Sequence, residues 1–166
     1  PSPVILAIEY SEACMSEEFS KHVRGQIRAA VAEALKGIPA TGGRVFQARA
    51  WPLQDEDLPC WLVHIEGEKV DTKQTGRARI QSREITISAV ALVKHADDVE
   101  DQMDDLTAVA EETIFSDAAV QLLTRDFVLT GTESVLNADG AMVIGQTRLA
   151  FTATIPALEG HPRNRA

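Results

Sequence analysis

The sequence predicts an α+β fold, in which an N-terminal helix and a central acidic helix pack on a mixed or antiparallel sheet of about five strands. Apolar residues recur at helical spacing in residues 19–37 and again in residues 99–114. Five other segments alternate between apolar and polar residues or form short apolar runs, as strands do. The order is helix, three strands, two helices and two strands, which favours helices packed on one sheet.

Length and composition fit a single domain. The chain has 166 residues, of which 45% are hydrophobic and 25% charged, and a domain of this size folds without a disulfide or a metal. We divide it into an N-terminal arm (1–18), one domain (19–156) and a C-terminal tail (157–166). Met15 resembles a protein start, so residues 1–14 are either an addition before it or a real arm. An apolar arm of this kind is often ordered by adding to a neighbour's sheet.

The first helix is expected from Phe19 to Gly37, because one face is apolar and Gly37 and Pro39 end it. That face comprises Phe19, Val23, Ile27, Ala30, Val31, Ala34 and Leu35. A short strand is predicted at 44–50 and a second strand at 60–66, where Trp61 and Val63 share one side. Between these strands lies an acidic loop that Pro52 and Pro59 keep from pairing as strand.

A long polar excursion is expected at 67–76, followed by a strand at 79–94. The second half of that strand, residues 89–93, is apolar at every position. Such a run indicates a central strand that is covered on both faces.

Asp97 is expected to cap the second helix, with Glu100 three residues later in a capping-box arrangement. Its buried stripe should comprise Val99, Met103, Leu106, Ala110 and Thr113 or Ile114. Ser116 is expected to cap a short third helix at 117–123. Two strands, 126–136 and 141–155, should then form a hairpin around the turn signal at 137–140.

The net charge of −9 comes from one segment. Residues 97–117 hold nine acidic residues and no Lys or Arg, whereas acidic and basic residues balance in the rest of the chain. By contrast, residues 69–94 hold six basic residues and two acidic ones. An acidic chain is a poor general nucleic-acid binder, because phosphate affinity needs clustered Lys and Arg.

The sequence offers no catalytic or cofactor motif. The four histidines lack metal-ligand spacing, and no phosphate-binding glycine loop or nucleophile elbow is present. Acidic pairs such as Asp104-Asp105 are interpreted as a hydrated or partner-facing surface, because a solvated helix does not separate two carboxyl pKa values. We therefore expect no enzyme activity, no metal and no cofactor. No segment has the apolar length to cross a membrane, and the N-terminal apolar run is too short for a signal peptide.

Several stretches together resemble one known family. They are RVFQARAWPL (44–53), QDEDLPCWLV (54–63), the strand at 84–93, the Asp-rich helix from Asp97, LTGTE (129–133) and RLAFT (148–152). In order and spacing the chain resembles, from about 19 to 155, the tail terminator proteins of phages with long non-contractile tails, a family also called minor tail protein U-like. Residues before Met15 depart from the pattern.

The resemblance implies a structural role in the virion, at the head-proximal end of the tail, after assembly in the host cytoplasm. Such proteins form a hexameric ring that caps the tail tube, stops its elongation and joins it to the head. The implied partners are other copies of the chain, the tail tube protein and a head-side connector or stopper protein. DNA would only pass through the lumen, and neither a membrane nor a cofactor is involved.

Candidate contact residues follow from the charge pattern. The hypothesis is that the basic region of one subunit faces the acidic helix of the next, or that this helix lines the lumen and repels passing DNA. Trp51 either closes the edge of the core or anchors an interface. The candidates for contact with a neighbour or the tube are Trp51, Asp55, Glu56, Lys69, Lys73, Arg77, Arg79, Asp101, Asp104 and Asp105.

Three alternatives remain open from the sequence. The first is a head-tail connector or stopper protein of the same assembly. The second is a non-viral α+β module that binds a small ligand in an apolar pocket. The third is an enzyme with an unfamiliar site around His64 or the acidic helix, which would need a strongly perturbed carboxyl or imidazole in a cleft.

Overall fold

The computed structural model describes residues 21–47, 54–72, 74–95, 98–139 and 142–166. The predictions for the N-terminal arm, Phe19, Trp51, Lys73 and Asp97 lie outside these ranges.

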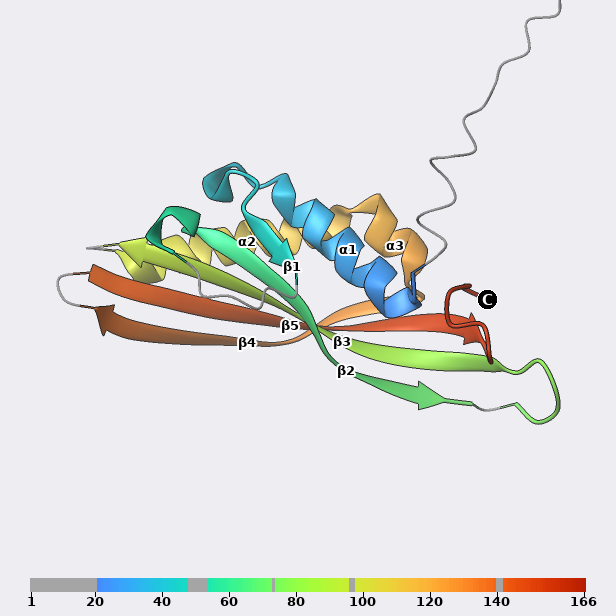
Figure 1. Ribbon diagram of the computed structural model, residues 1–166. Coiled ribbons are helices and arrows are strands. Elements are labelled where there is room, and N and C mark those ends of the chain that lie inside the picture. Colours follow the sequence, from blue (N-terminus) through green and yellow to red (C-terminus); the bar gives the residue numbers. More distant parts are fainter. Residues whose placement is uncertain (1–20, 48–53, 73, 96–97, 140–141) are drawn as a thin grey trace, which may run out of the picture.

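One five-stranded sheet runs the length of the molecule (Figure 1). In spatial order it contains β1 (Val45–Gln47), β2 (Cys60–Asp71), β3 (Ile80–His95), β5 (Met142–Leu158) and β4 (Asp126–Asp139). β1 runs parallel to β2, and the other neighbouring strands are antiparallel. The predicted mixed sheet of five strands is confirmed, with β3 at its centre.

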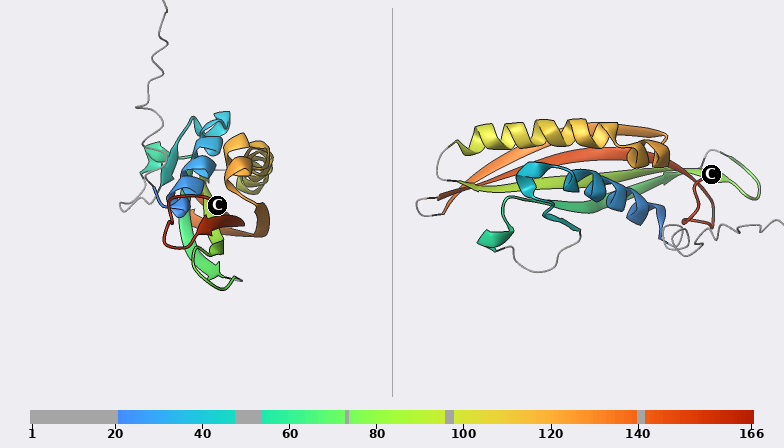
Figure 2. Two further views of the ribbon diagram at one scale, coloured as in Figure 1. Left: turned by 90° about the vertical axis from the view of Figure 1, so that its right-hand side faces the viewer. Right: turned by 90° about the horizontal axis from the view of Figure 1, so that it is seen from above.

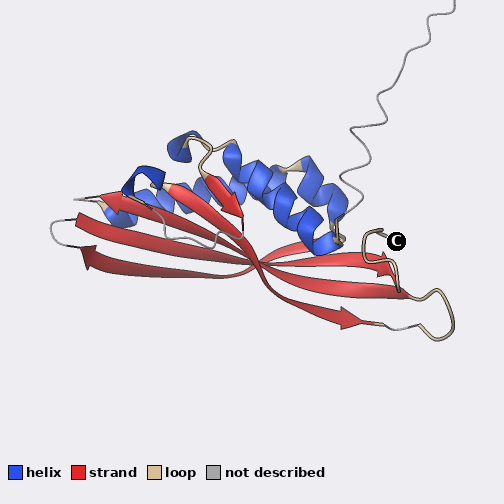
Figure 3. Ribbon diagram, in the orientation of Figure 1, coloured by secondary structure: helices blue, strands red, loops and turns tan. Residues whose placement is uncertain are grey.

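Three helices form a second layer: α1 (Val23–Lys36), α2 (Val99–Ser116) and α3 (Ala118–Leu123). They lie on one side of the sheet, and in the described part of the chain no α-helix covers the other side (Figures 2 and 3). We call this other side the helix-free face. The α+β class with helices packed on one sheet is therefore confirmed.

The core fills the space between the helices and the sheet. From α1 it takes Val23, Ile27, Val31 and Leu35, as the helical spacing predicted. Aromatic rings close it near the C-terminal end of α2, where Phe127 and Phe151 stack at 5.1 Å between ring centroids. Phe115 meets both rings edge-on. This packing stabilises the sheet through burial of apolar surface and ring contacts.

β2 is longer than predicted, because residues 67–71 continue the strand instead of starting a loop. Lys69 pairs with Glu84 and Val70 with Arg83 across the β2–β3 ladder. A bulge between Ile65 and Gly67 marks the change. The segment was predicted as an excursion because its polar side chains give no apolar face, whereas the backbone ladder to β3 holds it as strand.

The caps of α2 and α3 also differ from the prediction. Asp98 is the N-cap of α2, in the left-handed conformation (φ 58°) and without a side-chain capping hydrogen bond. A capping side chain works from an extended N-cap residue, so Asp98 does not cap the helix in this way, and the predicted N-cap, Asp97, lies outside the described residues. Ser116 belongs to α2, and Asp117 caps α3 through a 2.9 Å hydrogen bond that the Val120 amide donates.

The apolar run in β3 is central, but helices cover it on one side only. Ala89, Ala91 and Val93 face the core. Val90 points to the helix-free face and is still 5% exposed. Leu62 and Arg148 flank it in register on the two neighbouring strands, so cross-strand side chains take the place of a second layer.

The C-terminal residues fold back onto the end of the molecule where α1 begins (Figure 1). The Pro162 carbonyl accepts a 2.9 Å hydrogen bond from the Val23 amide, and the Arg163 carbonyl accepts from the Gln26 side chain. Arg165 forms an isolated bridge with Ala157. This segment therefore takes up the otherwise orphaned amide of Val23 in the first turn of α1.

Candidate assembly surfaces

β4 forms one open edge of the sheet. It is 14 residues long, and no described strand pairs with its outer side. Its sequence contains no Pro, Lys or Arg, the residues that usually protect an edge from another strand. Val128, Val135 and Leu136 on it are 45%, 51% and 43% exposed. A long edge with exposed apolar side chains is a template for pairing with a further strand.

Among the residues that the structure describes, which leave out 48–53 after β1, the second half of β2 forms the other open edge. β1 covers only residues 61–63. Within the described ranges, no strand continues this cover from His64 to Val70. The two open edges are the opposite lateral edges of one sheet. One edge is formed by β4 and the other by β2.

The strand directions make these edges compatible. β2, β3, β5 and β4 alternate in direction across the sheet, because each pair is antiparallel. β2 and β4 therefore run in opposite directions. If a second copy is placed beside the first in the same orientation, its β2 meets β4 as an antiparallel neighbour, and the alternation continues.

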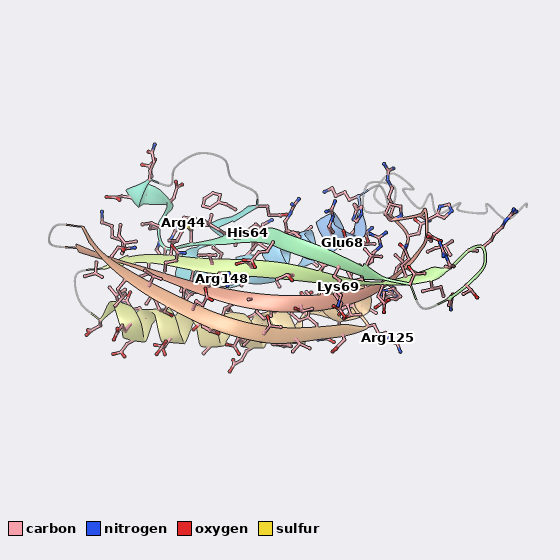
Figure 4. The ribbon with its side chains drawn as sticks, turned by 90° about the horizontal axis from the view of Figure 1, so that it is seen from below. Arg44, His64, Glu68, Lys69, Arg125 and Arg148 are labelled. Carbon is pink, nitrogen blue, oxygen red and sulfur yellow. The ribbon has the colours of Figure 1, made fainter. Side chains whose placement is uncertain are left out.

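Arg148 joins three strands on the helix-free face (Figure 4). From β5 its Nε donates to Glu66 Oε1 on β2 at 2.7 Å and to Ser88 Oγ on β3 at 3.2 Å. Its Nη1 donates to Glu133 Oε2 on β4 at 3.2 Å. The pKa of the Glu66 carboxyl is lowered, chiefly by its hydrogen bond with Arg148. The face thus carries an alternating row of charge, in which Glu133 stands at the open β4 edge.

The predicted basic contact residues have different roles. Arg79 is held within the chain by a bidentate pair with Glu159, with both bonds at 2.6 Å, so it fastens the C-terminal segment. Lys69 lies 3.8 Å from Glu84 and remains largely exposed on β2. Arg77 is exposed in the loop of the β2–β3 hairpin. Of the three described candidates, Arg77 and Lys69 are thus exposed, whereas Lys73 lies outside the described residues.

The predicted acidic residues fall in two places. Asp55 and Glu56 belong to a short 3-10 helix (Asp55–Asp57), and the Lys94 Nζ donates to Asp55 at 2.9 Å. Asp101, Asp104 and Asp105 are exposed on α2. Asp105 borders an open groove of about 370 Å³, whose other lining residues are Ala40, Pro59, Val93, Gln102, Leu106 and Val109. The structure does not bring these acidic residues near the described basic hairpin of the same chain.

A partly buried charge cluster supports the start of α1. Glu68 accepts from Arg83 at 2.7 Å and lies 3.4 Å from the Arg24 Nε. The Nδ1 of His22 caps the helix by accepting the Arg24 amide at 3.1 Å. Burial lowers the pKa of His22, and the guanidinium of Arg24 lowers it further. The neutral imidazole therefore serves as the cap.

Sequence reasoning missed Glu66, Glu133 and Arg148, because their proximity depends on strand order. One signal was available, namely that residues 126–139 contain no Pro, Lys or Arg. Within the described residues, no group of three or more His, Cys, Asp and Glu side chains is arranged to hold a metal ion. None of the described helices combines the length and apolar character of a membrane span.

No protein-family model and no curated protein matches the sequence. A chain of a solved structure described as "Virion of native gene transfer agent (GTA) particle" is similar to this one at 18% identity, over 81% of this chain and 98% of that chain. The TM-score is 0.44.

Proposed function

We propose that this protein is a structural subunit that assembles head to tail into a hexameric ring on the end of a phage tail tube. There it stops tube elongation and offers a surface to the head-side connector. The observation that carries the proposal is the pair of open, direction-compatible edges on opposite sides of one sheet. The six-fold number and the place on the tail come from the sequence resemblance. The role requires no reaction and no cofactor.

Pairing of these edges makes a heterologous contact, because β4 of one copy meets β2 of the next. Contacts of this kind form closed rings when the rotation between copies closes, and filaments when it does not. Sheet closure also removes both exposed edges, which otherwise invite aggregation. A closed ring is therefore the arrangement in which β4 and β2 are protected in every copy.

The one-sided helix layer supports one orientation of the subunit in the proposed ring. Helices thicken one side of the sheet, so a ring closed through sheet edges has room for them on its outer surface (Figure 2). In this arrangement the helix-free face, with Glu66 and Glu133 beside Arg148, lines the lumen through which DNA passes. The acidic α2 then lies on the outside, where Asp101 and Asp104 are available to a basic partner such as Arg77 of an adjacent subunit.

Negative-stain imaging of the protein with and without tail tubes tests the proposal. We expect a six-fold ring at one tube end. A double variant, Val128→Lys/Val135→Lys, protects the β4 edge and should abolish the ring while leaving the monomer folded. Val109→Lys/Leu122→Lys, which changes two exposed apolar residues of the helix layer, is the matched control and should retain it.

Two outcomes would count against the proposal. Capped tubes in the β4 double variant would show that the edge is not the contact. Binding to heads and not to tubes would identify the protein as a head-side stopper instead.

A further inference from the structure

Features of the sheet restrict the register in which neighbouring copies can pair. We infer that β2 of one copy pairs with the C-terminal half of the next copy's β4, with Lys69 opposite Glu133. This inference rests on the edge-to-edge ring proposed above and adds the residues that meet. It follows from three constraints: the position of β1, the alternation of side chains, and the charges at the two edges.

The position of β1 excludes an arrangement in which neighbouring copies stand level, without displacement along the strands. Within the molecule, one row of paired residues crosses the sheet from His64 through Ser88 and Ala150 to Gly131. If copies stood level, the neighbour's Gly131 would come beside His64. The rest of that β4 strand would then extend along residues 61–63, where β1 is already paired. Two strands cannot occupy the same position beside β2, so the copies must be displaced along the strands.

The alternation of side chains limits the displacement. Lys69 stands on the helix-free face, because it pairs with Glu84 in the row that continues to Thr154 and Asp126. It must therefore stand beside a β4 residue of the same face. With the bulge between Leu129 and Gly131 taken into account, these residues are Asp126, Val128, Gly131, Glu133, Val135, Asn137 and Asp139.

Charge selects among these positions. Asp126 corresponds to the level arrangement that β1 excludes, and Asp139 leaves too little of β4 to pair. Glu133 is the remaining acidic partner. Its side chain is 72% exposed and pairs with Arg148 on β5, the neighbouring strand of the same copy. Placing Lys69 there gives Val70 opposite Thr132 and Gly67 opposite Val135. Only the last two residues of β4 reach the position of β1, so in this register the pairing with β2 ends before them.

This register continues the charge row across the boundary. Within one copy, Glu66, Arg148 and Glu133 alternate in sign from β2 through β5 to β4. Lys69 and Glu84 of the next copy then extend the alternation. Opposite charges on directly facing strands stabilise the pairing, whereas like charges oppose it. The displacement is about 20 Å along the strand, so the strands run obliquely to the ring axis, as strands in closed barrels do.

Disulfide trapping tests the register. In a Cys14→Ser background, Val70→Cys/Thr132→Cys should give a ladder of cross-linked oligomers up to the closed ring on mild oxidation. The level arrangement would instead link Val70→Cys/Arg125→Cys, which is the matched control. The native Cys60 is buried in the sheet, and single-cysteine variants correct for any contribution from it.

A second measurement does not depend on disulfide geometry. Glu133→Gln should weaken assembly about two- to fivefold per contact, whereas Asp126→Asn should leave it unchanged. Cross-linking through residue 125, or equal effects of the two neutral variants, would overturn the register while rings still form. Absence of rings from the wild-type protein on tubes would instead overturn the proposed function itself.

Discussion

Replacement of Gly145 by Ala tests how closely α2 packs on the sheet. Gly145 lies on β5, and a Cβ at this position would point at the first turns of α2. It would fall 2.5 Å from Val99 Cγ1 and inside van der Waals contact with Met103 Sδ. Carbon atoms pack best at about 3.5–4.0 Å, so α2 or its side chains must move by about 1 Å.

The magnitude depends on which neighbour yields. Met103 has several rotatable bonds and adapts readily. Val99 is β-branched, holds one preferred rotamer in a helix and is 6% exposed, so its clash is relieved only by displacement of the helix. Overpacking of this kind costs about 1–3 kcal/mol. The gain from replacing a strand glycine offsets about 0.5–1 kcal/mol of this. We expect Gly145→Ala to destabilise by about 1–2 kcal/mol.

Urea denaturation followed by circular dichroism measures this change, and a double-mutant cycle identifies its cause. In Val99→Ala/Gly145→Ala the added methyl occupies the space that Val99 leaves, so the coupling energy should reach about 1 kcal/mol. Gly131→Ala is the control, because no atom lies within 4 Å of a Cβ there. Equal stability of the Gly131→Ala and Gly145→Ala variants, or additive effects in the cycle, would refute the packing described for α2.

Two further predictions concern the end of the molecule where α1 begins. The pKa of His22 is lowered in the folded state, so its contribution to stability is present above its ordinary pKa near 6.5 and is lost as the pH falls through the lowered value. His22→Asn keeps a capping acceptor that does not titrate, so the free energy of unfolding should fall less between about pH 7.5 and 5.5 than in the wild type; equal losses would contradict the cap assignment. For the C-terminal segment, Arg79→Gln should speed hydrogen exchange at the amides of Glu159 and Ala166 without changing global unfolding, whereas Arg77→Gln should not; identical exchange in both variants would show that the Arg79–Glu159 pair does not hold the segment.

Much of the fold was predictable because buried apolar residues recur at regular spacing along a helix or a strand. The apolar stripes on α1 and α2 follow from spacing alone. Ile27 and Ala110 are therefore expected to be buried whatever the order of the strands beneath the helices. The end of β2 was not predictable, since Lys69 and Val70 extend beyond the helix layer and lack a buried face. The cap of α2 was missed because the backbone at Asp98 is left-handed, a conformation uncommon for any residue other than glycine.

The assembly surfaces were less accessible from sequence. Charge segregation suggested complementary regions, and it did not reveal that Arg79 pairs with Glu159 of the same chain. The order β1-β2-β3-β5-β4 decides which strands are open, and strand order depends on contacts far apart in sequence. The proposed contact between Lys69 and Glu133 of neighbouring copies can be inferred only once that order is known.

Hydrogen exchange of the protein on tail tubes, compared with the protein alone, tests whether β4 of one copy pairs with β2 of its neighbour. We expect the amides of residues 131–137 of β4 and of residues 64–70 of β2 to gain protection on assembly, and the Val128→Lys/Val135→Lys variant to show no such gain. Unchanged exchange along both edges in tubes that are visibly capped would contradict it.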